Sequence, residues 1–170
     1  MNFLELAEKR YSVRKFSNTP VEREKLDMIL QAGRLAPTAH NNQPQSILVL
    51  QSREALEKLK GCTRFHFDAP AALIVCSDQS LSWKRPYDNK DHGDIDASIV
   101  CAHMMLAAAD LGLGTTWVCH YDPDAVIREF SLPENIVPSS ILPLGYPADD
   151  AAPSARHADR KPLAGTVKFI

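Results

Sequence analysis

The chain has 170 residues, of which 45% are hydrophobic and 24% are charged, a composition that supports one globular domain with a substantial core. A formal net charge of -2 gives no general attraction to nucleic acid or to an acidic membrane surface, so we expect neither as a partner. We read no signal peptide at the N-terminus, and no apolar run approaches the roughly 20 residues of a spanning helix. We therefore expect a single cytoplasmic domain over residues 1–170.

The cysteines and histidines predict neither a disulfide framework nor a metal site. The four cysteines, at 62, 76, 101 and 119, form no C-x-x-C pair, and without a secretory signal they are expected to be buried thiols. The six histidines are scattered and none is paired as H-x-x-x-H. We expect no metal centre.

The first informative stretch follows a short helix expected over residues 3–10. It reads Arg10-Tyr11-Ser12-Val13-Arg14-Lys15-Phe16. If it is extended, alternation places Arg10, Ser12 and Arg14 on one side, where two guanidinium groups and a hydroxyl suit a phosphate dianion. Taken alone, the same residues also fit a basic surface segment that pairs with nearby glutamates.

The next two segments are a helix and a polar loop. Thr19, Pro20 and Glu22 are predicted to form a capping box that opens a helix ending near Pro37. The loop 37–44 concentrates three carboxamides, which suit the edge of a planar heterocycle because each group both donates and accepts. An ordinary polar turn is the alternative.

A strand at 46–50 and a helix from Ser52 to Gly61 follow, and the apolar run 71–76 predicts a strand covered on both faces. The irregular segment 78–94 carries Trp83 and Tyr87, aromatic residues that either line a pocket or pack on the surface. No calcium-loop spacing is present there.

Residues 95–113 form a helix that is apolar nearly all round, which predicts that it is buried on several faces and packs partly against a second copy of the chain. His103 on this helix is expected to be a core histidine. The Gly112-Leu113-Gly114 sequence follows a helix and lacks a third glycine, so we reject a dinucleotide-binding fingerprint.

The last part of the chain predicts a strand at 115–119, a helix from Asp122 to about Phe130, and a strand at 140–144. The tail from 148 onward is loop-like and carries a second basic point at Arg160-Lys161. Helices and strands do not alternate strictly, so the fold class is α+β. Two basic clusters, a carboxamide loop and no nucleophile set together favour a phosphorylated planar cofactor, which would carry its own chemistry.

The chain resembles the nitroreductase family of FMN enzymes over essentially its full length. The resemblance rests on six segments in order, namely R-Y-S-V-R-K-F at 10–16, A-P-T-A-H-N-N-Q-P at 36–44, the helix at 96–114, T-T-W-V at 115–118, L-P-L-G-Y-P at 142–147 and R-K-P-L at 160–163. It implies an α+β sandwich with a mostly antiparallel mixed sheet flanked by helices. It also implies a homodimer with FMN at the subunit interface.

The resemblance also implies a set of cofactor-binding residues. Arg10, Ser12 and Arg160 would hold the phosphate, with Lys161 as a weaker candidate. Arg14 would reach either the phosphate-ribityl region or the pyrimidine edge. The other implied residues lie on the flavin from either subunit, and they are Tyr11, Pro37, Thr38, Ala39, Asn41, Gln43, Thr116, Trp117, Val118 and Gly145. Gln45 and His40 depart from the usual pattern, and we name no catalytic side chain.

The implied reaction is a ping-pong transfer of hydride from NADH or NADPH to a small acceptor such as a nitroaromatic, a quinone or a flavin. A flavin sensor or storage protein is the alternative if Gln45 and the 78–94 loop cover the flavin. A reductive dehalogenase or a flavin-consuming oxygenase of the same family is a further alternative. The sequence predicts neither the acceptor nor the preferred nicotinamide cofactor.

Overall fold

The computed structural model describes residues 2–170. Its helices and strands alternate irregularly along the chain. In chain order they are α1 (Phe3–Lys9), α2 (Arg23–Arg34), η1 (Ala39–Asn41), β1 (Gln45–Leu50), α3 (Arg53–Cys62), β2 (Ala71–Asp78), α4 (Gly93–Asp110), β3 (Gly114–Thr115), α5 (Pro123–Phe130), β4 (Ile136–Gly145) and η2 (Leu163–Gly165).

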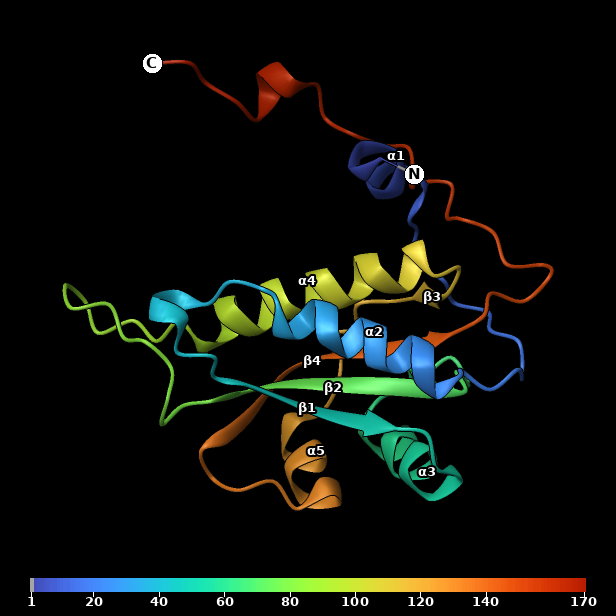
Figure 1. Cartoon of the computed structure of the whole chain (residues 1–170), viewed down its shortest axis with the longest axis horizontal. Coiled ribbons are helices and arrows are strands. Elements are labelled where there is room, and N and C mark those ends of the chain that lie inside the picture. The colour runs from blue at the N-terminus through green and yellow to red at the C-terminus, as the bar shows by residue number, and fades with distance from the viewer. Residues whose placement is uncertain (1) are drawn as a thin grey trace.

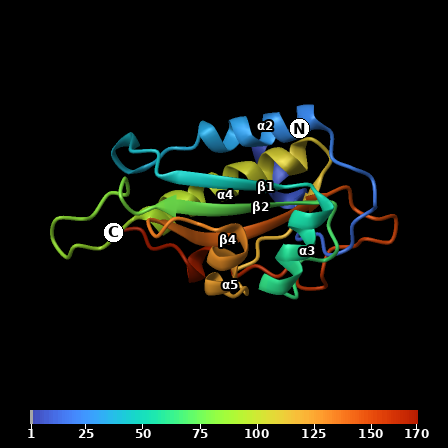
Figure 2. The same cartoon turned by 90° about the horizontal axis from the view of Figure 1, so that it is seen from below.

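The four strands form one sheet in the order β1-β2-β4-β3, and every pair of neighbouring strands is antiparallel. An isolated parallel bridge between Ser12 and Thr115 adds the N-terminal segment beside β3. Figure 1 shows α2 and α4 on one side of this sheet and α3 and α5 on the other. Figure 2 shows α3 and α5 on the lower side. The α+β prediction with a mostly antiparallel sheet is confirmed.

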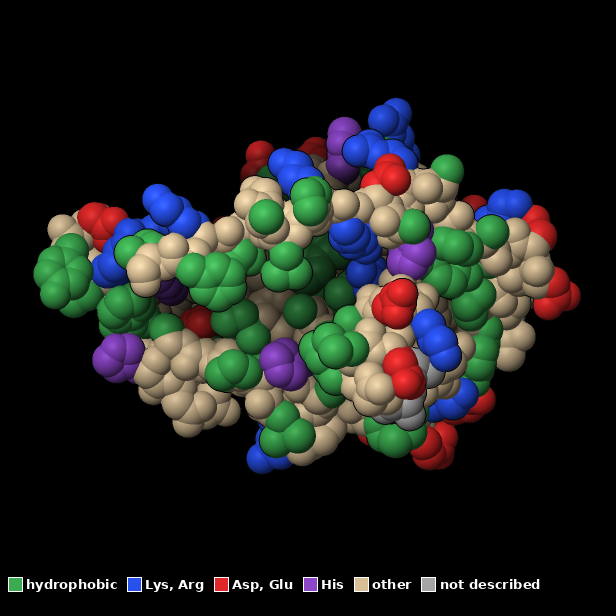
Figure 3. Space-filling model, turned by 90° about the horizontal axis from the view of Figure 1, so that it is seen from above, with side chains coloured by type: hydrophobic (Ala, Val, Ile, Leu, Met, Phe, Trp, Pro, Cys, Tyr) green, Lys and Arg blue, Asp and Glu red, His purple; other side chains and the backbone are tan. Residues whose placement is uncertain are grey.

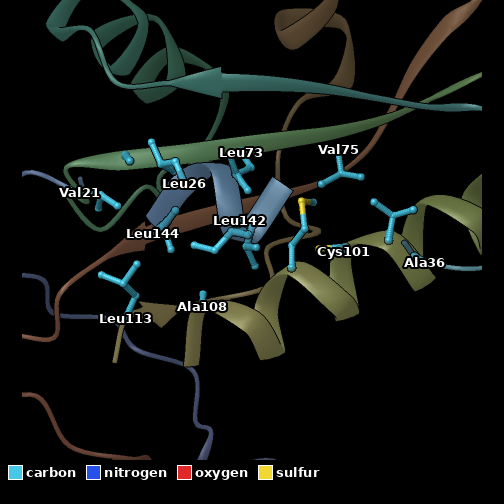
Figure 4. Packing of buried hydrophobic residues seen from close by; sticks show 14 of the residues in the cluster. Val21, Leu26, Ala36, Leu73, Val75, Cys101, Ala108, Leu113, Leu142 and Leu144 are labelled. Carbon is cyan, nitrogen blue, oxygen red and sulfur yellow. The ribbon is translucent and has the colours of Figure 1, made fainter. Parts of the chain in front are cut away.

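The central strand β2 supplies side chains to two separate cores. Alternation along a strand sends successive side chains to opposite faces. Leu73 and Val75 pack with α2 and α4, whereas Ile74 and Cys76 pack with α3 and α5. Figure 4 shows Leu73 and Val75 above Cys101 and Ala108 of α4. Burial on both faces explains the uninterrupted apolar run from residue 71, as predicted.

Helix α4 packs on the sheet through one side and leaves other side chains at the surface. Ala97, Val100 and Met104 are fully buried. His103, in contrast, is exposed and its Nδ1 lies 2.9 Å from the Ile99 carbonyl oxygen, so the prediction of a core histidine is wrong. The prediction rested on the apolar character of the helix, which does not identify the side that faces the sheet.

Several predicted element ends differ from the structure, and β4, predicted from residue 140, already begins at Ile136. Helix α2 begins at Arg23 with Glu22 as N-cap and no side-chain cap, because Val21 is buried in the core and Glu22 accepts from the Tyr146 hydroxyl at 2.8 Å. Gly61 lies within the last turn of α3 instead of ending it. The strand predicted at 115–119 is reduced to β3, after which only Val118 pairs, with Ile141.

The segment 10–16 is extended and docks against the end of the sheet. Val13 is buried, its N–H donates to the Thr115 carbonyl at 2.9 Å, and its carbonyl accepts from the Thr116 hydroxyl. Gly114 lies directly beneath it, since a Cβ at that position would be 2.5 Å from Val13 Cγ2. The residues on either side, Ser12 and Arg14, therefore project away from the core.

We predict that Gly114→Ala lowers the free energy of unfolding by about 1–3 kcal/mol, because the new methyl group overlaps a buried β-branched side chain. Gly61→Ala is the matched control, since a Cβ there meets nothing within 4 Å. It should be neutral or stabilising by up to about 1 kcal/mol because alanine favours helix. Urea unfolding measures both, and equal stabilities for the two variants would contradict the proposed packing.

Candidate functional site

A basic hollow of about 510 Å³ lies where the N-terminal segment meets the C-terminal tail. Arg10, Ser12 and Arg14 line it from the extended segment, as the alternation predicted. The tail contributes four further residues, which are Ser154, Arg156, His157 and Arg160. Four guanidinium groups and two serine hydroxyls in one hollow are a donor set suited to a phosphate dianion.

Arg156 and His157 were missed by the sequence analysis. The His157 ring lies edge-on to Tyr11 at 6.3 Å, and its Nε2 is 3.1 Å from the Glu8 carbonyl oxygen. These contacts hold the tail against α1. Arg160 Nη1 donates to the carbonyls of His157 and Asp159 at 2.6 and 2.8 Å, so part of its donor capacity is already used. The tail has no periodic pattern from which this arrangement could be predicted.

A second, smaller hollow of about 210 Å³ lies beside the first. Its lining is largely aromatic, and it consists of Arg14, Phe65, Phe67, Thr116, Trp117, Val118, Cys119 and His120. Three of these, Thr116, Trp117 and Val118, were predicted to run beside a flavin ring. We call the two spaces the phosphate-side hollow and the ring-side hollow.

Arg14 lines both hollows and therefore joins them. Its side chain is exposed, and Nη1 donates to the Ser12 carbonyl at 3.2 Å. A single ligand with an anionic end and a planar aromatic end could contact Arg14 between the two. The structure thus brings together the predicted residues of the N-terminal segment, the strand after α4 and the tail.

The carboxamide turn at 37–43 lies elsewhere, next to the first turn of α4 (Figure 1). Asp96, which is 2% exposed, fixes it by accepting from the Ala39 N–H at 2.9 Å. The Gln43 N–H donates to the Thr38 hydroxyl at 3.0 Å. His40, Asn41 and Gln43 have positive φ angles of 52°, 55° and 52°. Such strained backbone persists only where the surroundings hold it, and it is common at ligand sites.

His40 is exposed in this turn, but its ring has one aromatic neighbour. Its ring stacks on Trp83 of the 78–94 segment, with centroids 5.3 Å apart and planes at 24°, and Trp83 lies edge-on to His92 at 4.8 Å. Gln45 begins β1, and its Oε1 is buried. The 78–94 segment therefore packs against the carboxamide turn of its own chain, while Asn41 and Gln43 stay exposed. It then projects away from the body as a hairpin (Figure 1).

The predicted binding residues form two groups at opposite ends of α4. The carboxamide turn lies beside its first turn, while Val13 and Thr115 lie beyond its last. The helix has 18 residues, and at 1.5 Å per residue it is about 27 Å long. One chain therefore leaves the carboxamide turn far from the two hollows.

Gly145 and Lys161, two further predicted residues, line neither hollow. Gly145 is buried at the end of β4, where a Cβ would lie 2.6 Å from Pro70 Cδ. Lys161 is exposed in the tail. Tyr11, in contrast, lines the phosphate-side hollow together with Arg10 and Ser12, although alternation alone would turn it to the other side.

The pattern of the nitroreductase family matches residues 7–64 and 60–146. The chain belongs to the nitroreductase family. A nitroreductase family protein of Clostridium difficile 630, known from its crystal structure, is 46% identical, with a TM-score of 0.94 over 99% of this chain and 98% of that one.

Two curated relatives of this nitroreductase family member are also similar. A Methanothermobacter thermautotrophicus protein named "Putative NADH dehydrogenase/NAD(P)H nitroreductase" is 36% identical over 162 residues, 88% of this chain and 80% of the relative. The FMN reductase [NAD(P)H] of Bacillus subtilis is 30% identical over 163 residues, 85% of this chain and 66% of the relative. The resemblance read from the six segments is confirmed, and with it the family's α+β sandwich. The assignment of individual binding residues stays a prediction.

Within residues 2–170, no helix combines the length and apolar character that crossing a bilayer requires. In the same described range, no three acidic, histidine or cysteine side chains are grouped as a metal site would need.

The thiols differ sharply in their surroundings. Burial raises the pKa of Cys76 to about 12 and that of Cys101 to about 11, and burial also raises the pKa of Cys62. These three are buried, whereas Cys119 is exposed and lines the ring-side hollow. Reactivity depends on access and on the thiolate fraction, so Cys119 is the thiol available for chemistry.

We predict that the native protein reacts with iodoacetamide at Cys119 alone between pH 7 and 8. The raised pKa of the other thiols keeps them protonated in that range, and burial blocks the reagent. Peptide mass spectrometry locates the label, and denaturation in urea should expose all four sites. Rapid native labelling of Cys76 or Cys101 would contradict the buried positions.

Proposed function

We propose that this protein is an FMN-dependent oxidoreductase that uses NADH or NADPH to reduce nitroaromatics, quinones or flavins in a ping-pong order. The observation that carries the proposal is the position of Arg14 between a basic hollow and an aromatic one. Membership of the nitroreductase family and the names of the two curated relatives support it.

The phosphate-side hollow would hold the FMN phosphate. Arg10 and Arg160 contribute guanidinium groups from opposite ends of the chain, and Ser12 contributes a hydroxyl. Arg156, which the tail brings to the same hollow, adds a further cation. Because the tail is bound to α1 through His157 and the Glu8 carbonyl, the two ends of the chain form this hollow together.

The ring-side hollow would hold the planar part of the cofactor. FMN, when bound, takes two electrons as a hydride from NAD(P)H and passes them to the second substrate. The chain's own part is to bind, orient and exclude water, because the lining offers aromatic and apolar surface beside one guanidinium group. Arg14 stabilises negative charge at the edge of the ring. No side chain is needed as a nucleophile.

A second copy of the chain would complete the site. The carboxamide turn lies at the far end of α4 from both hollows, so the copy that supplies Asn41 and Gln43 to a flavin is not the copy that supplies Arg10. The tail supports this assembly, since Leu163, Phe169 and Ile170 are exposed by 74%, 94% and 116%. Figure 3 shows the face on which α1 and the tail lie, where hydrophobic side chains (green) are prominent. Such a surface is typical of an interface.

Arg10→Ala should raise the Kd for FMN by about 10- to 150-fold, because one charge-assisted phosphate contact is worth roughly 1.5–3 kcal/mol. Arg34→Ala removes the same charge from the end of α2, where the side chain bonds to Gln31, and is the control. Quenching of FMN fluorescence during titration measures both. An unchanged Kd in Arg10→Ala would contradict the phosphate assignment.

The flavin should also protect Cys119. Because this thiol lines the ring-side hollow, saturating FMN should slow its alkylation by at least about 10-fold while leaving its rate in urea unchanged. Riboflavin, which lacks the phosphate, is the control at the same concentration and should protect less. Equal labelling rates with and without bound FMN would place the ring outside this hollow.

The direct test of the function is an absorbance scan of the purified protein followed by anaerobic addition of NADH or NADPH. We expect flavin bands that bleach on addition. A yellow protein that does not bleach would favour a flavin sensor or store. A colourless protein that takes up no FMN would contradict the proposal.

A further inference from the structure

The segment 63–70, between α3 and β2, builds an aromatic wall on the ring-side hollow. Phe65 and Phe67 line the hollow, with ring centroids 6.0 Å apart. His120, from the segment between β3 and α5, lines the same hollow and lies edge-on to Phe65 at 5.1 Å and 73°. This segment was not predicted from the sequence, because its two phenylalanines lie in a loop and form no pattern that marks a binding site.

Hydrogen bonds to residues 120–122 hold the wall in place. The Thr63 hydroxyl donates to the His120 carbonyl at 2.6 Å, and the Asp122 N–H donates to the Cys62 carbonyl at 2.8 Å. Phe67 and Asp68 are two successive residues with positive φ angles, 54° and 48°. A folded chain keeps two such residues only where the surroundings fix them, and they concentrate around ligands.

Arg64 places a positive charge next to this wall. Its guanidinium carbon lies 4.9 Å from the centroid of the Phe65 ring. It also lines an adjoining hollow of about 400 Å³ that shares His120 with the ring-side hollow. The Arg64 side chain is exposed. Within residues 2–170, its guanidinium group has no hydrogen-bond or ion-pair partner.

The other charged side chains that line this adjoining hollow, Lys60 and Asp122, already have partners. Lys60 pairs with Glu57 at 3.0 Å and with Asp68 at 3.2 Å. The Asp122 carboxylate accepts from the Ala125 N–H at 3.1 Å and caps α5. The residues that line the ring-side hollow include no acidic side chain. An anionic ligand is therefore not repelled inside the ring-side hollow, and Arg64, which lines the adjoining hollow, is the cation on this side that has no partner among the described residues.

We propose that Arg64, backed by Phe65 and His120, makes this protein select electron acceptors that are planar aromatic carboxylates. The flavin ring would occupy the ring-side hollow, so the acceptor would stack on the flavin with the aromatic wall at its rim. The planar guanidinium group of Arg64 matches the acceptor's carboxylate through paired hydrogen bonds. Arg14, which lines the ring-side hollow itself, serves the cofactor. The proposal rests on the proposed function and names the substrate class of the same site.

The test compares 4-nitrobenzoate with 4-nitrobenzamide, which has the same shape without the charge. Binding to the FMN-loaded protein is measured without NAD(P)H from the change in flavin absorbance, and kcat and KM are measured with NADH. The wild type should bind the carboxylate about 5-fold more tightly at low ionic strength, and added salt should reduce the preference. Arg64→Ala should abolish the preference through Kd and KM, with kcat unchanged.

Arg53→Ala is the matched control, because it removes the same charge from the first turn of α3 and lines neither hollow that Arg64 adjoins. It should keep the preference. Equal affinity for the two probes in the wild type, or a preference that survives in Arg64→Ala, would overturn the proposal. An effect of Arg64→Ala on NADPH alone would also overturn it, since Arg64 would then bind the dinucleotide.

The outcomes separate this proposal from the one on which it rests. A protein that binds no FMN, or whose flavin does not bleach with NAD(P)H, contradicts the proposed function and the substrate class together. A protein that bleaches but treats the two probes alike retains the proposed function and loses only the substrate class.

Discussion

The candidate site depends on the docking of Val13 over Gly114. The two backbones approach closely because Gly114 has no side chain, and the Val13 N–H then reaches the Thr115 carbonyl at 2.9 Å. Because side chains alternate along an extended segment, the buried Val13 turns Ser12 and Arg14 outward. One buried valine thus sets the polar groups of the N-terminal segment beside the residues that follow α4. Without this contact the phosphate-side and ring-side hollows would have no common wall.

The rest of the fold is a support that keeps the two ends of the site apart. Strand β2 is buried on both faces and carries a core on each side, which makes the sheet a rigid centre. Helix α4 lies along this sheet with Asp96 at one end, holding the carboxamide turn, and β3 just beyond the other. A stiff helix between two groups of binding residues explains why a second copy is needed in the proposed function.

The sequence predicts best where one local rule determines the structure. Asp122 followed by proline predicts the start of α5, and the Asp122 carboxylate does cap that helix, accepting from Ala125 at 3.1 Å. The strand from Ala71 follows from its unbroken apolar run, because β2 is covered on both sides. The polar side of Arg10, Ser12 and Arg14 follows from alternation.

Prediction fails where distant contacts override the local pattern. Thr19, Pro20 and Glu22 fit a capping box. However, Val21 is buried in the core and the Glu22 carboxylate accepts from the Tyr146 hydroxyl, so α2 starts later. Arg156 joins the site only because the tail folds back on α1. The aromatic wall at Phe65 depends on bonds between segments that lie more than fifty residues apart, such as Thr63 to His120. No pattern within the segment itself contains that information.

The central claim is that each flavin is held by residues of two copies of the chain, and subunit mixing tests it most directly. One variant is Arg10→Ala, and the other is Asn41→Gly with Gln43→Gly, which removes the carboxamides but permits the left-handed backbone. Each alone should bind FMN weakly. When the two are co-expressed, paired copies should regain one intact site, so about one site in four binds FMN with wild-type affinity. If mixed pairs form and no tight site returns, the residues act within one chain and the account is contradicted.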